Sequence, residues 1–356
     1  MKTNKKRLQE KIVSLKPYVY EMPSISAVSI KILILLLIQI AMLVLTKSYS
    51  AVIVIACSTL GALCASYIHY FFVKKNQFMS LPGMLQGIII GMLLPESYPP
   101  ITAFFISLVT LLIFKYIFED SENFWINVVS VSVVIAYFIG RRYFPGYQVS
   151  HDLIKLKNPS VLLINSGVFP VYDFDVSFTG YLNSNFFAKL KVTLPQGIIS
   201  MLWDTHSVIP AFRFNLLTLI GSIVLFSDNS FSLLIPTLFL FTYGLLVRVF
   251  FPYGADTEMN QGDIVLALLT SGTLFAAVFM IQWFGTHPMT IVGKIMYALF
   301  AGILAFLIAG CGTSPVGMIY VVVICNILNL LIRQVEEKRM DKLIHRMSEP
   351  QGVEGK

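Results

Sequence analysis

Residues 80–100 read SLPGMLQGIIIGMLLPESYPP, which is apolar enough to lie in a membrane but too short to cross one as a helix. Pro82 and Pro95 bracket only twelve residues of this stretch. At 1.5 Å per residue, twelve helical residues reach roughly 18 Å, whereas the hydrocarbon core is about 30 Å thick. Lipid cannot satisfy the free backbone groups at the ends of such a helix. We therefore expect protein to surround it.

The composition is that of a membrane protein. Hydrophobic residues make up 56% of the chain and charged residues 13%, with a mean hydropathy of +0.76, whereas a soluble chain carries about a quarter charged residues. The basic residues behind the net charge of +7 gather at the two ends, which is typical of cytoplasmic flanks on an anionic bilayer and not of a nucleic-acid-binding protein. The polar, basic start MKTNKKRLQEK predicts no cleavable signal peptide.

Ten apolar segments predict an all-α polytopic fold. Two of them, 81–95 and 262–282, are apolar but interrupted or flanked by Gly and Pro. The eight of spanning length are 28–46, 50–73, 99–118, 123–140, 208–226, 230–251, 290–309 and 314–333.

Lys and Arg residues predict the orientation of these spans. They cluster before the first span, after the second and after the last, whereas the alternate short loops PESYPP, PYGADTEMNQ and CGTSP contain none. Both termini are therefore expected in the cytoplasm of a bacterial cell, with the chain in its inner membrane.

The longest connection, 141–207, is expected outside the cytoplasm, because long loops cross the membrane regardless of their charge. It either caps the bundle or carries part of the function. The expected division of the chain is 1–27 cytoplasmic, 28–140 first five-span repeat, 141–207 outer loop, 208–333 second five-span repeat and 334–356 cytoplasmic tail.

The second half repeats the first. In each half a Gly-rich apolar segment leads into a lysine-bearing span, and a helix with an Asn follows, Asn127 in the first half and Asn326 in the second. Five spans per half is an odd number, so the second copy should be inverted, with 81–95 and 262–282 as paired broken helices. Such a repeat places a binding site near the midplane, lined by half-helix ends.

Few residues suggest chemistry of their own. The four cysteines and five histidines form no CxxC pair and no Cys/His cluster, so we expect no metal site. No nucleophile–base triad, phosphate loop or carboxylate pair stands out. Asp263 and Asp204 are expected to cap the helices that follow them. Cations near helix ends are expected to reach the membrane surface: Lys115, Lys294, Arg213 and Arg248.

The stretches SGTLFAAVFM, GTHPMTIVGKIMYALFAGILAFLI and GTSPVGMIYVVVICNILNLLI resemble the C-terminal third of one membrane family. This family contains RnfD, a membrane subunit of the Rnf electron-transport complex, and the corresponding membrane subunit of the sodium-pumping NADH:quinone oxidoreductase. The stretch LPGMLQGIIIGMLLPESYPP resembles its first broken helix. The candidates for lining the midplane site are Gly83, Pro95, Asn127, Gly272, Thr286, Pro288, Pro315, Gly317 and Asn326.

The resemblance implies a subunit of a larger complex that couples electron transfer to Na⁺ or H⁺ movement, with a flavin mononucleotide (FMN) covalently attached in the outer loop. The family's acceptor is the last Thr of Ser/Thr-Gly-Ala-Thr. Here the nearest match is TGYL, with Leu182 at the acceptor position and Thr179 and Ser184 as the nearest hydroxyls. A covalent FMN is therefore not expected, and any FMN or riboflavin should be bound noncovalently.

Three functions remain open from the sequence. The first is a membrane subunit of an Rnf/NQR-like complex, acting as part of a redox-driven translocase with other membrane subunits as partners. The second is a stand-alone channel or transporter for a small solute or ion, which the missing acceptor Thr favours. The third is a scaffold subunit without redox groups.

Overall fold

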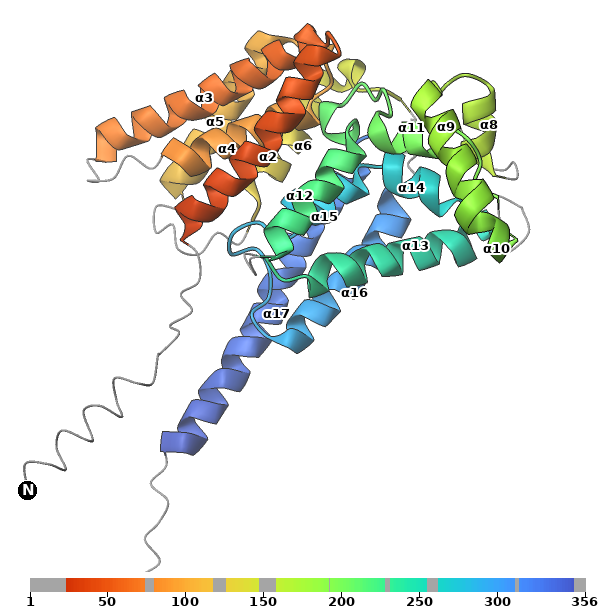
Figure 1. Cartoon of the computed structure of the whole chain (residues 1–356). Helices are drawn as coiled ribbons and strands as arrows, with labels where there is room; N and C mark the ends of the chain where they lie inside the picture. Colours follow the sequence, from red (N-terminus) through yellow and green to blue (C-terminus); the bar gives the residue numbers. More distant parts are fainter. Residues whose placement is uncertain are drawn as a thin grey trace, which may run out of the picture.

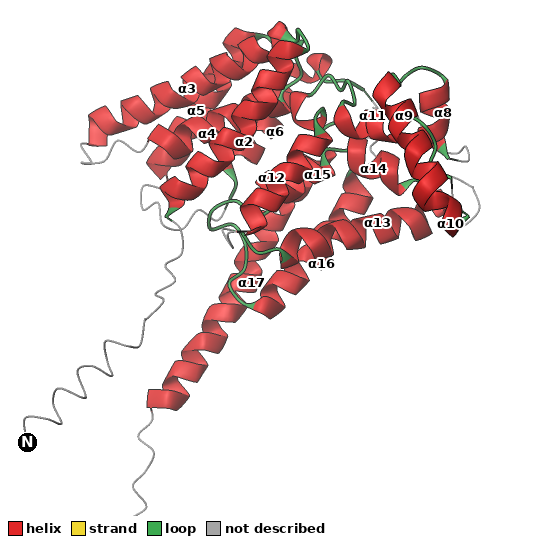
Figure 2. Cartoon of the chain, viewed as in Figure 1, coloured by secondary structure: helices red, strands yellow, loops and turns green. Residues whose placement is uncertain are grey.

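A computed structural model describes residues 24–73, 80–117, 126–146, 158–191, 193–227, 231–254, 262–310 and 314–348. The described residues contain helices and connecting loops but no strand (Figure 2). The expected cytoplasmic segment before residue 24 and part of the outer loop, 147–157, lie outside them.

The first half consists of five apolar helices and one turn of 3₁₀ helix. Ser24 caps the first helix by accepting a hydrogen bond from the N–H of Ala27 at 3.2 Å. The elements are α2 (Ile25–Leu45), α3 (Tyr49–Val73), α4 (Ser80–Leu93), α5 (Pro100–Ile117), α6 (Val128–Gly140) and η1 (Arg141–Tyr143).

Short helices follow in the long loop, and the second half contains six more helices. The loop elements are α8 (Pro159–Asn165), α9 (Asp173–Leu182), the π-helical turn η2 (Asn183–Phe187), α10 (Ala188–Leu190), α11 (Ile198–Trp203) and the 3₁₀ turn η3 (Pro210–Phe212). The second half holds α12 (Asn215–Ser227), α13 (Leu234–Gly254), α14 (Ile264–Thr270), α15 (Thr273–Phe279), α16 (Ile291–Ile308) and α17 (Gly317–Ser348).

Four helices of the described chain are long and apolar enough to cross a membrane: Ile25–Leu45, Tyr49–Phe72, Ile291–Ile308 and Gly317–Lys342. Four shorter apolar helices accompany them: Leu81–Leu93, Pro100–Phe114, Asn215–Ser227 and Leu234–Phe250. The start of α2 and the end of α17 lie toward one side of the molecule, and α8–α11 lie toward the other (Figure 1).

The short helix α4 is buried because two glycines let it approach α3 closely. A Cβ at Gly87 would lie 2.7 Å from the Cα of Thr59, and one at Gly91 would lie 2.5 Å from the Cα of Ile55. The hydroxyl of Ser58 donates to the carbonyl of Gly87 at 2.9 Å. This is the small-xxx-small packing used between membrane helices.

The expectation that 81–95 forms a broken helix is wrong, because α4 runs without interruption from Ser80 to Leu93. Pro82 lies in the first helical turn, where a missing N–H costs nothing, and the two glycines serve packing. Residues 262–282 do contain a break, between α14 and α15.

The helices pack in the same pairs in both halves. In the first half α3 packs on α4 and α5, α2 packs on α4, and α6 packs on α4 and α5. In the second half α13 packs on α15 and α16, α12 packs on α15, and α17 packs on α15 and α16. The halves meet through their first helices, α2 and α12, and through their last, α6 and α17.

Candidate functional site

The outer loop folds around one buried carboxylate, that of Asp175 in α9. Its Oδ2 accepts hydrogen bonds from the N–H groups of Gly197 (3.0 Å) and Ser200 (2.7 Å) and from the hydroxyl of Ser200 (2.7 Å). Its Oδ1 accepts from the hydroxyl of Thr179 at 2.6 Å. Asp175 therefore joins α9 to the start of α11.

Burial acts to raise the pKa of Asp175, but the hydrogen bonds from Thr179, Ser200 and Gly197 outweigh it, so that the pKa lies below its ordinary value. The carboxylate is therefore ionised at neutral pH, and its charge is held by donors of the loop itself.

The family's flavin acceptor does not fit this loop. Leu182 has no hydroxyl, and Thr179 is fully buried with its hydroxyl bonded to Asp175. Ser184 is exposed in the π-helical turn η2, where its hydroxyl donates to the carbonyl of Tyr181. A phosphoester at Thr179 would require the loop to open.

A second buried charge ties the loop to the first half. Arg213 donates to Asp204 through Nε (2.8 Å) and Nη2 (2.9 Å), and its Nη1 donates to the hydroxyl of Ser48 between α2 and α3. Asp204 is 2% exposed and Arg213 7%. The expectations that Asp204 caps a following helix and that Arg213 reaches the membrane surface are both wrong, because each neutralises the other in the interior.

Aromatic residues lie next to this ion pair. The hydroxyl of Tyr172 lies 3.0 Å from Nε2 of His206, and the Tyr172 ring stacks on that of Phe174. Nδ1 of His206 is 3.8 Å from Oδ2 of Asp204. Burial, and next the charge of Asp204, raise the pKa of Tyr172.

The break in 262–282 falls at Ser271 and Gly272. Gly272 has φ +71°, and a Cβ there would lie 2.5 Å from the Phe212 ring. A side chain at this position would meet both backbone strain and a steric clash. Asp263 caps α14 as expected, accepting from the N–H of Leu266 at 3.0 Å, and it also accepts from the N–H of Ser160 at 2.9 Å. The cap thus also holds α8 of the loop.

The other midplane candidates occupy separate places. Gly83 lies in the first turns of α4 and Pro95 follows its end, and both are buried. Pro315 and Gly317 lie at the start of α17, where a Cβ on Gly317 would be 2.7 Å from the Cα of Ala309. They are thus spread between both ends of the bundle and do not form one cluster.

Three candidates meet the non-helical segment between α15 and α16. Asn127 caps α6, and its Nδ2 donates to the carbonyl of Met280 at 3.3 Å. Thr286 donates to the carbonyl of Trp283 at 2.8 Å, and Pro288 is buried shortly before α16 begins. The α6 end of the first half therefore touches the segment that ends the broken helix of the second half.

Asn326 is fully buried in α17, and a residue that the sequence pattern did not single out accompanies it. Asn329, one helical turn further, is also 0% exposed. The side-chain oxygen and nitrogen of both amides have no hydrogen-bond partner among the described residues. The i, i+3 spacing of two Asn in the apolar run ICNILNLL is the signal that could have found this pair.

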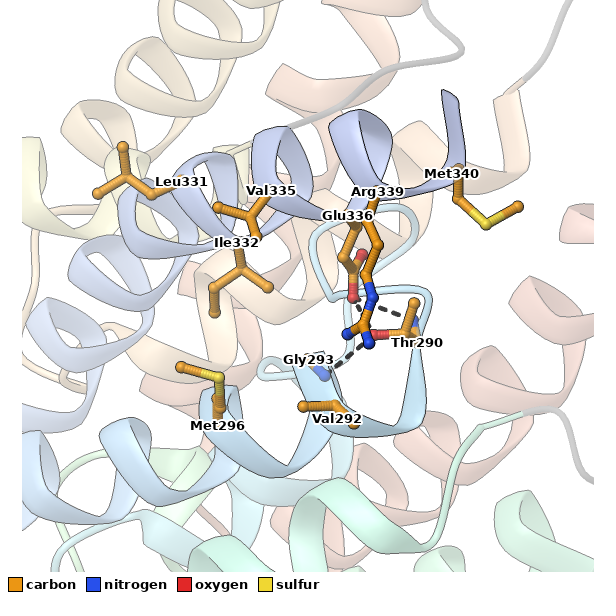
Figure 3. A pocket seen from close by; sticks show the side chains of 10 residues that line it. All are labelled: Thr290, Val292, Gly293, Met296, Leu331, Ile332, Val335, Glu336, Arg339 and Met340. Carbon is orange, nitrogen blue, oxygen red and sulfur yellow. Dashed lines mark hydrogen bonds between the residues drawn. The ribbon is translucent and has the colours of Figure 1, made fainter. Parts of the chain in front are cut away.

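A pocket of about 530 Å³ lies between the start of α16 and the last turns of α17 (Figure 3). Apolar side chains line most of it. Glu336 lies there and accepts from the N–H groups of Met289 and Thr290, each at 3.1 Å. Within the described ranges no three His, Cys, Asp or Glu side chains gather as a metal site.

Long apolar helices, short buried helices and charges paired in the interior define a multi-pass helical membrane protein. The model of the NQR2, RnfD, RnfE family matches residues 12–341, and the chain belongs to this family.

Two curated relatives belong to ferredoxin:NAD(+) oxidoreductase complexes, and each carries the letter D among the subunits of its complex. The chain is 25% identical over 284 residues (76% of this chain, 79% of the relative) to the relative from the proton-translocating complex of Clostridium ljungdahlii. It is 26% identical over 122 residues (34% and 35%) to the relative from the Na(+)-translocating complex of Acetobacterium woodii.

Proposed function

We propose that this chain is a membrane subunit of an Rnf/NQR-like complex that couples electron transfer to the movement of a monovalent cation across the membrane. The family match over residues 12–341 carries the proposal. The two relatives are named for different ions, protons in one complex and Na⁺ in the other. We therefore leave the coupling ion as Na⁺ or H⁺.

We also propose that the two halves form an inverted five-plus-five repeat with both termini in the cytoplasm. The equivalent helix pairs of the two halves, and the contacts of first helix with first and last with last, support it. An approximate two-fold axis in the membrane plane relates such halves and places the interface between them at mid-depth.

We propose further that electrons do not pass through a flavin attached covalently to this loop. Leu182 at the acceptor position and the buried hydroxyl of Thr179 support this part of the proposal. A flavin, if it is used here, binds noncovalently, and other subunits supply the remaining redox groups.

The experiment is purification of the tagged chain from its own membranes in a mild detergent. Other membrane subunits should co-purify, and the preparation should show the absorbance of flavin or iron–sulfur groups. A chain that purifies alone, without a chromophore, and moves a solute in liposomes would replace the proposal with the stand-alone transporter. The departure at Leu182 is the observation that favours this second function.

A further inference from the structure

Buried polar atoms without partners lie along one face of α17. Asn326, Asn329 and Arg333 are spaced i, i+3 and i+7, so that they lie above one another on the helix. Both polar atoms of each amide and Nε of Arg333 are buried without a hydrogen-bond partner in the described chain. Buried polar groups in proteins are nearly always bonded to protein or to ordered water.

Non-helical backbone and the last helix of the first half enclose this face. Arg333 donates from Nη2 to the carbonyl of His287, and Asn127 of α6 donates to that of Met280. Residues 280 and 287 belong to the same segment between α15 and α16, and α17 packs against α15, α16 and α6. Irregular backbone at membrane depth is tolerated where protein buries it or where it lines a water-filled cavity.

A third unpartnered group lies at the same depth. The rings of Tyr137 and Tyr320 are 6.4 Å apart, which fixes the register between α6 and α17. Seven residues back along α6 is Ser130, and six residues on along α17 is Asn326, each about 10 Å from its tyrosine. The buried hydroxyl of Ser130 also lacks a partner among the described residues.

The polar face continues into the pocket. The spacing of three and four residues runs on from Arg333 to Glu336 and Met340, which both line the 530 Å³ pocket (Figure 3). The face therefore leads from the last turns of α17, near the basic tail of the chain, to Asn326 in the bundle.

From this arrangement we propose that Asn326, Asn329 and Ser130 bind a file of water molecules that enters past Arg333 from the pocket. Water is the ligand class that fits, because each amide presents a donor and an acceptor together. A bare cation would bind the oxygens alone and would meet the positive charge of Arg333. The file is a half-passage that ends at Asn326. Its role in cation movement rests on the proposed function, whereas the presence of water does not.

Thiol labelling tests the water file. Single cysteines replace Asn326 or Asn329 in a background without Cys57, Cys64, Cys311 and Cys325, in the assembled complex in membrane vesicles. The probe is the small anionic reagent methanethiosulfonate ethylsulfonate, which does not cross lipid. The control keeps only the native Cys325, which is next to Asn326 and 1% exposed.

Both new cysteines should react from the side that carries the pocket, at least tenfold faster than the Cys325 control. Failure of both to react, or equal reaction of the Cys325 control, overturns the proposal. Neither result depends on electron transfer, so the labelling separates this proposal from the proposed function.

A measurement on the unaltered complex covers the case in which a variant does not fold. Brief radiolysis of water oxidises side chains beside bound water. Met280, 1% exposed, should be oxidised well above Met92 of α4, which is 0% exposed. Equal protection of the two methionines contradicts the water file.

Discussion

Asp175 shows how much one residue can hold. Its carboxylate collects four hydrogen bonds from Thr179, Gly197 and Ser200. Replacing it with Asn removes the charge and turns one oxygen into a donor that faces other donors. We expect Asp175→Asn to destabilise the loop by about 3 kcal/mol, seen as faster proteolysis between α9 and α11. Asp173→Asn, an exposed change of the same charge two residues away, should leave the digestion unchanged.

The same carboxylate gives the loop an acid limit. Its pKa is lower in the folded loop than in the unfolded chain, so the folded loop binds protons less readily. The stabilisation is therefore fully present above the unfolded value of about 3.9 and is lost as the pH falls through the folded value. Hydrogen exchange of residues 173–200 should stay slow from neutral pH to about pH 4 and rise below it. Exchange that rises already between pH 7 and pH 5 would contradict this assignment.

The acceptor position of the loop carries a prediction about covalent modification. Leu182 cannot form a phosphoester, and Thr179 is not accessible. The intact mass of the denatured chain should therefore equal that of the sequence without a flavin mononucleotide. An added flavin mass that maps to Thr179 or Ser184 would contradict the prediction and restore the covalent redox group.

At the scale of elements, the contact between α3 and α4 depends on side chains that are absent. A Cβ at Gly91 would lie 2.5 Å from the Cα of Ile55, a backbone atom that cannot move alone. We expect Gly91→Ala to cost about 1–3 kcal/mol, measured as a lower midpoint of thermal denaturation in detergent. Gly180→Ala in α9 has nothing within 4 Å of its new Cβ and should leave the midpoint unchanged or slightly higher.

The sequence predicts the helical class and the half-length of α4 well, because apolar length and proline positions are local signals. It does not predict that α4 is continuous, because glycines that break a helix and glycines that pack it look alike in the sequence. The pairing of Asp204 with Arg213 is also missed. Both residues stand near helix ends, and only the folded loop brings them together around Ser48. Of the midplane candidates, Asn127 and Asn326 lie where α6, α15 and α17 meet, but Asn329 is visible only once burial is known.

At the scale of the whole molecule, orientation is the property to test. The expected topology places the connection after α4 outside and the end of α17 in the cytoplasm. Single cysteines at exposed Ser97 and Lys338 should therefore react with an impermeant maleimide from opposite sides of the membrane, Ser97 in intact cells and Lys338 only in inside-out vesicles. Labelling of both positions from the same side would contradict the topology and the inverted repeat together.

Glu336 has a consequence for biosynthesis. It bonds the N–H groups of Met289 and Thr290 at the start of α16, yet it lies 46 residues beyond Thr290 along the chain. When the ribosome has released α16, Glu336 is still to be translated, so this helix enters the membrane with its first turn only partly capped. Its final seating must wait until α17 has been inserted beside it. The last two spans of this protein therefore mature as a pair, after translation is nearly complete.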